Sequence, residues 1–466
     1  MEMDLASLTI SSAQDQIQRK EFTALELTSA CLHLIERLDP TYHAFINFTP
    51  DLAVQAAIQV DGLIRNPGFA PSGMGLLGIP IGIKDLVNVA GVATTAGSGF
   101  NFKEMPDEDA PLVSRIKLSG GALVGKTNLH EIALGVTGVN PHFGTVKNPW
   151  DISCISGGSS SGSAVAVSLG MCLGAVGTDT GGSIRIPASL CGVVGLKPSY
   201  GRVSLRRVVP LSWNLDHAGT ITRTVQDAAL MLSVMAGYDK EDPASINNPV
   251  EDYQVNLYGS IKGWRVAFAT GNYFESMDGE VQKALRQVSE VLRGLGAQIE
   301  DVDLSWIEEL AQANSRMTQA DGAAFHRERL KNHPEMFGAD VLQRLQTGAN
   351  LRSSDYVLAR RTQVEGKRRF EKFFEKYEIL VLPTTPIPAP TIEGTGAIEA
   401  ARQLTRFTSP FNLTGLPALT LPCGFTNTGL PIGLQIVSKA WAERKVLQAG
   451  FAYEQATDWH NSHPKF

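Results

Sequence analysis

The sequence contains 466 residues, of which 43% are hydrophobic, and it carries a formal net charge of −6. This length allows one large domain or two to three ordinary ones, and the apolar content is sufficient for a large core. Because the charge is negative and no basic block occurs, direct binding of nucleic acid is not expected. The N-terminus has no signal-peptide pattern and the apolar stretches are too short to span a membrane, which predicts a cytoplasmic protein without membrane contact.

The cysteines show no Cys-x-x-Cys spacing, and most lie in apolar surroundings. This pattern predicts buried thiols, without a disulfide framework or a zinc site. No group of His, Cys, Asp and Glu has the spacing of metal ligands, so we expect neither a metal nor an organic cofactor. The cysteines are Cys31, Cys154, Cys172, Cys191 and Cys423.

The first part of the chain, residues 5–75, is predicted to be helical. Thr23 and Glu26 have the spacing of a capping box, and Pro40 is expected to end the helix that follows. Residues 77–84 are predicted to form a strand that enters a turn at Lys84. A helix over 110–119 and a short strand over 121–125 follow.

Two clusters rich in glycine and serine flank a short apolar run within residues 157–191. The first cluster, 157–163, is expected to continue as a helix, and residues 171–176 predict a buried strand. The second cluster runs from 177 to 187. Its small residues let the backbone approach a ligand, and successive amides can bind an anion beside the hydroxyl of Ser183. A flexible linker or a tight turn without chemistry are the alternatives, and the core-like segments around the clusters argue against a linker.

The remainder of the chain alternates strands with helices, and residues 245–375 contain no motif. Such alternation predicts an α/β sandwich with a buried mixed sheet. Strands are predicted at 264–269, 297–302, 379–383, 417–425 and 431–437. Helices are predicted at 224–236, 281–295, 340–376 and 442–457, and a Pro/Gly-rich loop near the site is predicted at 385–400.

Two short patterns in the chain also match motifs of other protein classes. Residues 120–127 fit the nucleotide-binding P-loop, but apolar residues 122–124 lie where the phosphate loop should be, which favours a strand. Residues 158–162 fit the Gly-x-Ser-x-Gly nucleophile elbow around Ser160, but the preceding residues 148–151 predict a loop where an elbow requires a strand.

A nucleophilic serine requires a base. His142 and His217 have no obvious triad context. Lys84 ends an apolar run and is either a surface residue with a buried stem or a desolvated base that accepts a proton near neutral pH. The carboxylate of Asp85 would oppose this second possibility if it lay close to Lys84.

Three blocks, in this order, resemble the amidase signature family of serine hydrolases. They are Gly-Ile-Pro-x-x-x-Lys-Asp at 78–85, Gly-Gly-Ser-Ser at 157–160 and Gly-Thr-Asp-Thr-Gly-Gly-Ser-Ile-Arg at 177–185. The similarity covers about residues 25–240 and resumes at 412–417. It implies a single α/β/α domain over 1–466 with about eleven strands. A helical part (1–75) would precede the signature core (77–240) and the completing helices and strands (241–466).

The resemblance also implies a Ser-Ser-Lys relay. In this relay Ser183 is the nucleophile, Ser159 is a bridging serine that follows a cis peptide bond, and Lys84 is the base; Ser-Lys sets are known variants of triad chemistry. The implied oxyanion hole consists of the backbone amides of Thr180, Gly181, Gly182 and Ser183, and each such donor typically contributes roughly 10²–10³ in rate. Asp179 and Arg185 are the supporting residues of this site.

We therefore expect a self-sufficient amidase that cleaves the C–N bond of a linear amide through an acyl-enzyme on Ser183. Its expected partner is a small-molecule amide, with no direct nucleic acid, no membrane, and a homodimer as an option. The alternative is a glutamine-hydrolysing A subunit of a tRNA-dependent amidotransferase. A third hypothesis, a nucleotide-binding protein, is supported by the P-loop pattern alone.

Two positions, interpreted through the resemblance, favour the free amidase. Thr405 stands where the amidotransferase subunits look to carry an aspartate, and Gly135-Val136 stand where they tend to have Gly-Ser. A site without these polar groups would be a poor host for a zwitterionic amino acid, because a buried charge without a partner is costly.

Overall fold

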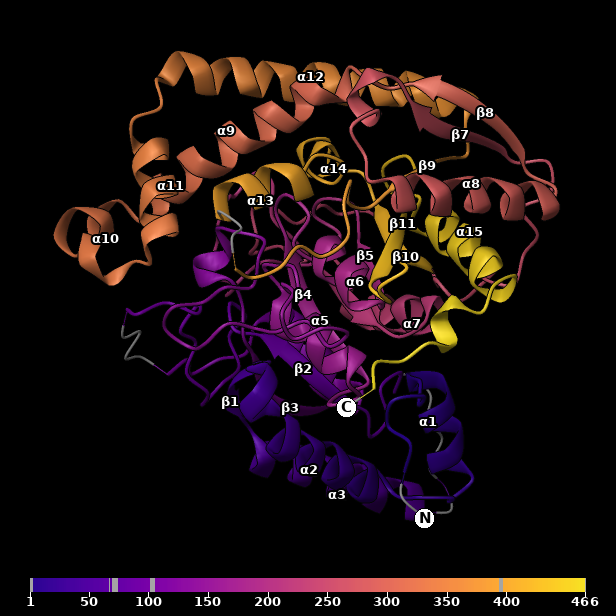
Figure 1. Ribbon diagram of the computed structural model, residues 1–466. Helices are drawn as coiled ribbons and strands as arrows, with labels where there is room; N and C mark the ends of the chain where they lie inside the picture. Colours follow the sequence, from indigo (N-terminus) through magenta and orange to yellow (C-terminus); the bar gives the residue numbers. More distant parts are fainter. Residues whose placement is uncertain (1–2, 67, 69–73, 101–104, 394–396, 466) are drawn as a thin grey trace.

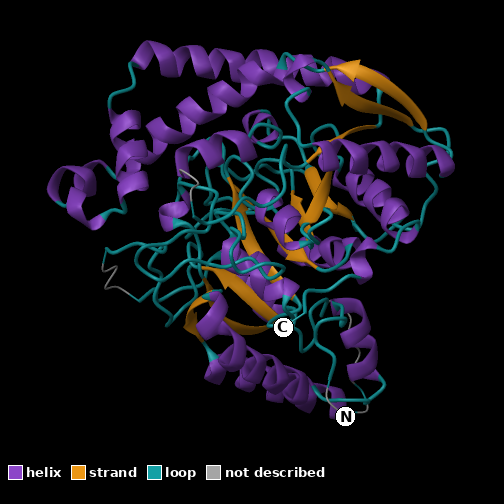
Figure 2. Cartoon of the chain, viewed as in Figure 1, coloured by secondary structure: helices purple, strands orange, loops and turns teal. Residues whose placement is uncertain are grey.

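The computed structural model describes residues 3–66, 68, 74–100, 105–393 and 397–465. Its centre is one eleven-stranded mixed sheet in the order β1-β3-β2-β4-β6-β5-β10-β11-β9-β7-β8, surrounded by helices (Figures 1 and 2). The strands are β1 Phe45–Phe48, β2 Pro80–Lys84, β3 Ala122–Thr127, β4 Gly174–Asp179, β5 Val194–Lys197, β6 His217–Thr222, β7 Arg265–Thr270, β8 Gln298–Asp303, β9 Ile379–Pro383, β10 Ala418–Phe425 and β11 Pro431–Val437. The predicted α/β sandwich with a helix-covered mixed sheet is confirmed.

The helices pack on the sheet and on one another. α5 and α6 contact each other and the central strands, while α7 and α15 contact each other and strands β6 and β10. The helices are α1 Ile10–Gln18, α2 Ala24–Tyr42, α3 Pro50–Arg65, α4 Pro111–Leu118, α5 Ser161–Ser168, α6 Arg185–Cys191, α7 Val225–Met235, α8 Gly279–Gly294, α9 Ile307–Phe325, α10 Arg327–Asn332, α11 Ala339–Ala349, α12 Ser353–Lys376, α13 Ala397–Leu404, α14 Ser409–Leu413 and α15 Glu443–Gln455. Within the described residues, none of these helices combines the length and apolar character needed to cross a bilayer.

The N-terminal region shows how capping sets the helix boundaries. The capping box is present: the Glu26 amide donates to Thr23 Oγ1 at 3.1 Å and the Thr23 amide donates to Glu26 Oε2 at 2.7 Å. The prediction that Pro40 ends this helix is wrong, because α2 continues to Tyr42. His43 ends it instead, with a left-handed backbone and an amide that donates to the Asp39 carbonyl.

Two further expectations need correction. Residues 45–48 are the strand β1, which pairs antiparallel with β3, and not a helix. The predicted loop at 385–400 is helical from Ala397, where α13 begins, and its residues 394–396 lie outside the described part of the chain.

The parallel pairing of β2 and β4 positions the site. Ile83 lies opposite Val176, so the carboxyl ends of both strands meet at one edge of the sheet. Lys84 is the last residue of β2, and the second glycine-rich cluster starts in β4 and continues beyond Asp179. Ligand sites in α/β sheets commonly lie at this edge.

The two patterns that match other protein classes adopt ordinary structure here. β3 occupies residues 122–127 of the P-loop pattern, and Lys126 forms a buried ion pair with Asp85 at 2.7 Å. Ser160 lies at the N-terminal end of α5, without a strand directly before it. Neither the phosphate loop nor the nucleophile elbow is formed.

Residues 307–376 form an arch of long helices over the site. α9 packs against α11, α12 and α14, and together they lie across one side of the molecule (Figure 1). The sequence of this part contains no motif, yet α9 contributes one wall of the main cavity.

Candidate active site

Lys84 is fully buried at the end of β2 and is surrounded by hydroxyl groups. Its Nζ donates to Ser159 Oγ at 2.8 Å, to Ser160 Oγ at 2.9 Å and to Thr178 Oγ1 at 2.8 Å. Burial lowers the pKa of Lys84 to about 7, although the charges of Asp179 and Asp216 act in the opposite direction. A lysine in this environment can be neutral, and can accept a proton, near neutral pH.

Asp85, the immediate neighbour of Lys84, does not pair with it. The Asp85 carboxylate forms an ion pair with Lys126 at 2.7 Å and accepts a hydrogen bond from Thr95 Oγ1 at 2.5 Å. The carboxylates whose charges act on Lys84 are Asp179 and Asp216, which lie far from it in the sequence.

The two implied catalytic serines come together through the backbone. The peptide bond between Gly158 and Ser159 is cis, as the resemblance implies. The Ser160 amide donates to the Ser183 carbonyl at 3.1 Å, which joins the two glycine-rich clusters. Within the described residues no hydrogen bond links the side-chain oxygens of Ser159 and Ser183. Hydrogen bonds of this kind are often long without substrate and shorten when it binds.

Two peptide units of the second cluster are candidates for the expected oxyanion hole. In a trans peptide the carbonyl and the amide point in opposite directions. Asn314 Nδ2 donates to the Thr180 carbonyl at 3.1 Å, and the Ile186 amide donates to the Gly182 carbonyl at 2.7 Å. The amides of these same units belong to Gly181 and Ser183, and neither amide has an acceptor within the described part of the chain.

The peptide unit that joins Gly181 to Gly182 has hydrogen-bond partners at both its carbonyl and its amide. The Gly181 carbonyl accepts from Thr408 Oγ1 at 2.7 Å, and the Gly182 amide donates to Asp179 Oδ1 at 2.7 Å. In this arrangement Gly182 stabilises the loop and does not face an oxyanion. Gly181 and Ser183 are thus the candidate donors, while Thr180 contributes its hydroxyl to Asp216 at 2.6 Å.

A fully buried ion pair between Asp179 and Arg185 supports this loop. Arg185 Nη2 lies 2.9 Å from Asp179 Oδ1, and Arg185 also donates to Asn412 Oδ1 and to Gln435 Oε1. Burial opposes ionisation of Asp179, but the Arg185 charge and hydrogen bond hold its pKa well below the ordinary value. The carboxylate therefore stays charged and can hold the Gly182 amide in place.

The histidines that the sequence offered as possible bases are engaged elsewhere. His217 begins β6, where its Nδ1 lies 2.6 Å from the Leu215 carbonyl, and burial holds its pKa well below the ordinary value. His142 Nε2 lies 3.1 Å from Glu131 Oε1. Neither forms a hydrogen bond with Ser159 or Ser183 in the described structure.

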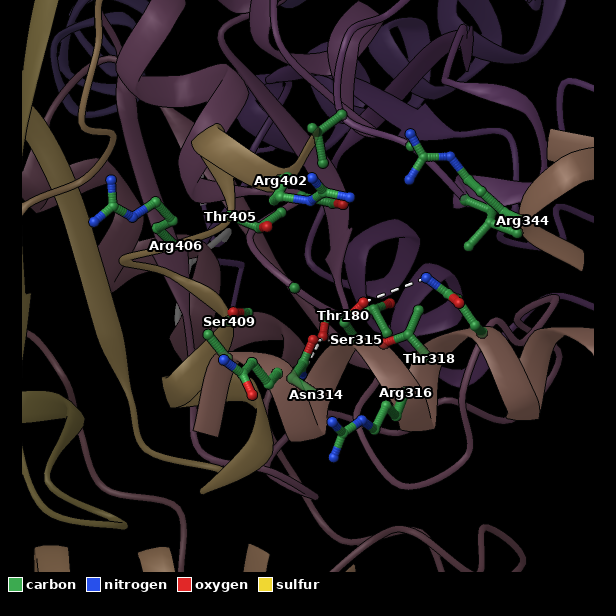
Figure 3. A pocket seen from close by; sticks show the side chains of 18 of the residues that line it. Thr180, Asn314, Ser315, Arg316, Thr318, Arg344, Arg402, Thr405, Arg406 and Ser409 are labelled. Atoms are coloured by element: carbon green, nitrogen blue, oxygen red, sulfur yellow. Dashed lines mark hydrogen bonds between the residues drawn. The ribbon is translucent and has the colours of Figure 1, made fainter. Parts of the chain in front are cut away.

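Ser183 lines a cavity of about 600 Å³. Figure 3 shows this cavity from close by, with Thr180, Asn314 and Thr405 among the labelled side chains. Leu134, Val136 and Leu211 supply apolar wall, and α9 supplies a polar wall through Glu308, Gln312, Asn314, Ser315 and Gln319. Arg402, Thr405 and Arg406 enter from the end of α13 and the turn after it. The sequence analysis missed the polar residues of α9; their only signal was recurrence every three or four residues on one face of that helix. The described residues contain no group of three or more His, Cys, Asp or Glu placed to hold a metal ion.

Comparisons with known proteins agree with the sequence motifs. The family described as Amidase matches residues 26–447. The A subunit of the glutamyl-tRNA(Gln) amidotransferase from Geobacter metallireducens is 38% identical, over 98% of this chain and 99% of its own length. Seven further relatives with the same name are 36–38% identical.

Solved structures also match almost the whole of this chain. A structure described as an unexpected vestigial protein complex, which reveals the evolutionary origins of an s-triazine catabolic enzyme, is 31% identical. It covers 96% of this chain and 98% of that chain, with a TM-score of 0.91. The A subunit of the glutamyl-tRNA(Gln) amidotransferase from Thermotoga maritima is also 31% identical, over 98% of this chain and 96% of that chain, with a TM-score of 0.82.

These findings overturn two expectations. The expected self-sufficient amidase is wrong, because the relatives that match almost the whole chain are named as subunits of an amidotransferase. Thr405 and Val136, on which that expectation relied, do line the cavity. The expected partners, a small amide alone, no nucleic acid and an optional homodimer, are wrong for the same reason. A net charge averaged over a whole chain does not exclude a protein or tRNA partner.

Proposed function

Because this chain belongs to the amidase family, we propose that it is the glutamine-hydrolysing A subunit of a tRNA-dependent amidotransferase. The observation that carries this proposal is the 38% identity to such a subunit over 98% of this chain and 99% of the relative. The match therefore extends over almost the full length of both proteins. The proposal takes residues 1–466 as a single amidase domain, and it is supported by the participation of strands from both halves of the chain in one sheet.

The proposed reaction begins with proton transfer. Neutral Lys84 accepts a proton from Ser159, Ser159 accepts one from Ser183, and the Ser183 oxygen attacks the side-chain amide carbon of glutamine. The oxyanion that forms accepts hydrogen bonds from the amides of Gly181 and Ser183. The buried contact of 2.8 Å between Lys84 and Ser159 supports the first of these transfers.

The same groups then complete the cycle. The C–N bond breaks, the relay returns its proton to the nitrogen, and ammonia leaves for the acceptor. Water gives a proton to the relay and attacks the ester on Ser183, which releases glutamate and restores the serine. Each turnover consumes one glutamine and one water, and it requires no oxidant, reductant or metal.

The experiment is co-purification of the chain with the partner subunits encoded by its organism. Ammonia release from glutamine is then measured with and without glutamyl-tRNA. We expect turnover by the assembly, and its loss in Ser183→Ala but not in Ser233→Ala, a serine on α7 whose hydroxyl donates to the Ala229 carbonyl. An assembly that leaves glutamine intact in the presence of tRNA would overturn the proposal.

A further inference from the structure

Asp216 is buried beside the oxyanion loop, and the sheet places it there. In the antiparallel pairing of β4 with β6, Asp179 lies opposite His217. Thr180, which follows β4, and Asp216, which precedes β6, are therefore adjacent, and Thr180 Oγ1 donates to Asp216 Oδ1 at 2.6 Å. Thr180 lines the cavity, whereas Asp216 is not among the described residues of its wall. Asp216 therefore acts on a substrate through its neighbours and not by contact.

The second oxygen of this carboxylate organises the turn before β6. Asp216 Oδ2 accepts from the amide of Leu211 at 2.9 Å and from the amide of Ser212 at 3.0 Å. Burial raises the pKa of Asp216 to about 6, and its hydrogen bonds with Thr180, Leu211 and Ser212 oppose that rise. The group is therefore charged at neutral pH, and it connects the turn to the oxyanion loop.

The peptide unit that joins Thr180 to Gly181 is held from two directions. Asn314 Nδ2 donates to its carbonyl at 3.1 Å (Figure 3), and Asp216 holds the Thr180 side chain. The amide of this unit belongs to Gly181, a candidate donor to the oxyanion. With carbonyl and side chain both held, the direction of that amide is set before a substrate binds, which is what stabilisation of an oxyanion requires.

The charge of Asp216 also acts on Lys84. Burial lowers the pKa of Lys84 to about 7, and the charges of Asp179 and Asp216 oppose that fall. Asp179 is already paired with Arg185, whereas in the described part of the chain no cation forms an ion pair with Asp216. Proton transfer from Ser159 would place a positive charge on Lys84, and a nearby carboxylate stabilises that charge.

Two other titratable groups near Asp216 are uncharged near neutral pH. Burial and the Asp216 charge raise the pKa of Tyr200 to about 12, and burial holds the pKa of His217 well below the ordinary value. Asp321 on α9 is separated from Asp216 by Ser212, whose hydroxyl donates to Asp321 Oδ2 at 2.5 Å. A change at Asp216 should therefore be felt at Lys84 without a second group that changes its charge in between.

We propose that Asp216 is a positioning residue of the relay: it orients the Thr180 peptide, and its charge stabilises Lys84 after Lys84 has accepted a proton. This inference rests on the proposed function and deepens it. Asp216 exchanges no proton with the substrate. Without its charge, Lys84 should lose its proton at lower pH and should be a weaker base once neutral.

The first test is Asp216→Asn in the assembled complex, with glutamine hydrolysis measured between pH 5.5 and 9. At pH 8 we expect kcat to fall by about 10- to 100-fold, the range of a hydrogen bond to a charged group, with KM changed less than about threefold. The acid limb of kcat/KM should move to lower pH by about one unit, the lower end of the effect of a nearby opposite charge. The loss should therefore be smaller at pH 6 than at pH 8. An unchanged kcat, or an equal loss at every pH, would overturn the inference.

Asp227 on α7 offers a matched control. It is also buried, and it accepts from the amides of Ile10 and Ser11 and from the Ser11 hydroxyl. Asp227→Asn should lower the free energy of unfolding, as Asp216→Asn does, but should leave kcat and the pH profile as in the unmodified chain. If both variants lose activity alike and keep the same acid limb, Asp216 has a purely structural role and the inference is wrong.

Variants of Thr180 separate orientation from charge. Thr180→Val removes the hydroxyl and keeps the Asp216 carboxylate, so kcat should fall by about tenfold while the acid limb stays in place. Thr180→Ser should retain most of the activity. Equal kcat values for these two variants would overturn the inference, even if Asp216→Asn does not fold. An unmodified assembly that leaves glutamine intact would count against the proposed function, whereas an active assembly insensitive to Asp216→Asn would count against this inference alone.

Discussion

The two sides of the candidate site differ in burial and in the way their residues are held. The relay side, built on the ends of β2 and β4, is buried, with Lys84 0% and Ser183 4% exposed. Its polar groups bond mostly to one another, as in the contacts of Lys84 with three hydroxyls. The wall side, built from α9 and the end of α13, carries exposed residues such as Glu308 and Arg402.

This difference assigns separate tasks to the two sides. A buried hydrogen-bonded network fixes geometry and shifts pKa values, which is what proton transfer requires. Residues on a more exposed wall can change without disturbing that network, so they suit recognition of the donor. Asn314 connects the two, since it belongs to α9 and bonds to the loop of Ser183. Changes on the relay side should therefore lower kcat or stability, and changes on the wall should alter KM.

The largest effect is expected for Lys84→Ala. Removal of the base should lower kcat by about 10³-fold or more, with a small change in KM, because general-base catalysis typically contributes roughly 10²–10⁴. In the unmodified chain, kcat/KM should rise as pH increases through about 7, since Lys84 must lose its proton to act. Steady-state kinetics between pH 5.5 and 9 measure both. A flat profile, or an active Lys84→Ala, would remove Lys84 from the relay.

Arg185→Leu should have the next largest effect, on stability. It leaves the buried Asp179 carboxylate without its partner, and breaking such a pair typically costs about 3–5 kcal/mol. The free energy of unfolding, from urea titrations, should fall by that amount. In the control variant Arg361→Leu, which loses an exposed pair with Glu365, it should change by less than about 1 kcal/mol. Similar losses in both variants would mean that burial does not set the strength of the Asp179 pair.

Asn314→Ala should produce an intermediate loss. The Thr180 carbonyl loses its donor, so the Gly181 amide is no longer aimed at the oxyanion. Removal of a complete oxyanion donor costs roughly 10²–10³, and loss of its orientation alone should lower kcat by about 10- to 100-fold. KM should change less than threefold. Gln319→Ala, which alters the same helix and cavity away from the loop, serves as the control. A loss confined to KM would place Asn314 with the recognition residues and break the distinction drawn above.

The smallest effect is expected for Ser160→Ala. Ser160 contacts Lys84, but Ser159 and Thr178 remain as acceptors of its hydrogen bonds. We expect kcat to fall by less than about tenfold while KM is unchanged. A variant as inactive as Ser183→Ala would assign the nucleophile or the bridge to Ser160 and contradict the proposed relay.

Local patterns were sufficient to predict most of the sheet. The strand at 379–383 was predicted at the bounds of β9, because a short apolar run before a proline has few alternatives. β1 was missed because it has four residues, follows α2 closely and pairs with a strand far along the chain. A short segment of that kind depends on a non-local partner, which no local pattern reveals.

The candidate site likewise combines residues that motifs predict with features that depend on distant parts of the chain. Lys84, Ser159 and Ser183 were named from family motifs, whereas their proximity depends on the parallel pairing of β2 with β4. That Gly182 faces Asp179 could not be inferred, since peptide orientation depends on partners such as Thr408 and Asn314. The wall residues lie in a segment without motifs, and their spacing alone cannot separate a cavity wall from an ordinary polar helix face.

The burial of the cysteines has a practical consequence. All five are free and buried, and burial raises the pKa of Cys172 to about 12. Thiolates, not thiols, react with alkylating reagents, so the folded chain should resist maleimide labelling at neutral pH. Each labelled thiol then records an opening of the structure around it, from Cys31 in α2 to Cys423 in β10. The chain thus carries its own set of reporters for local unfolding, and mass spectrometry can follow them without an added probe.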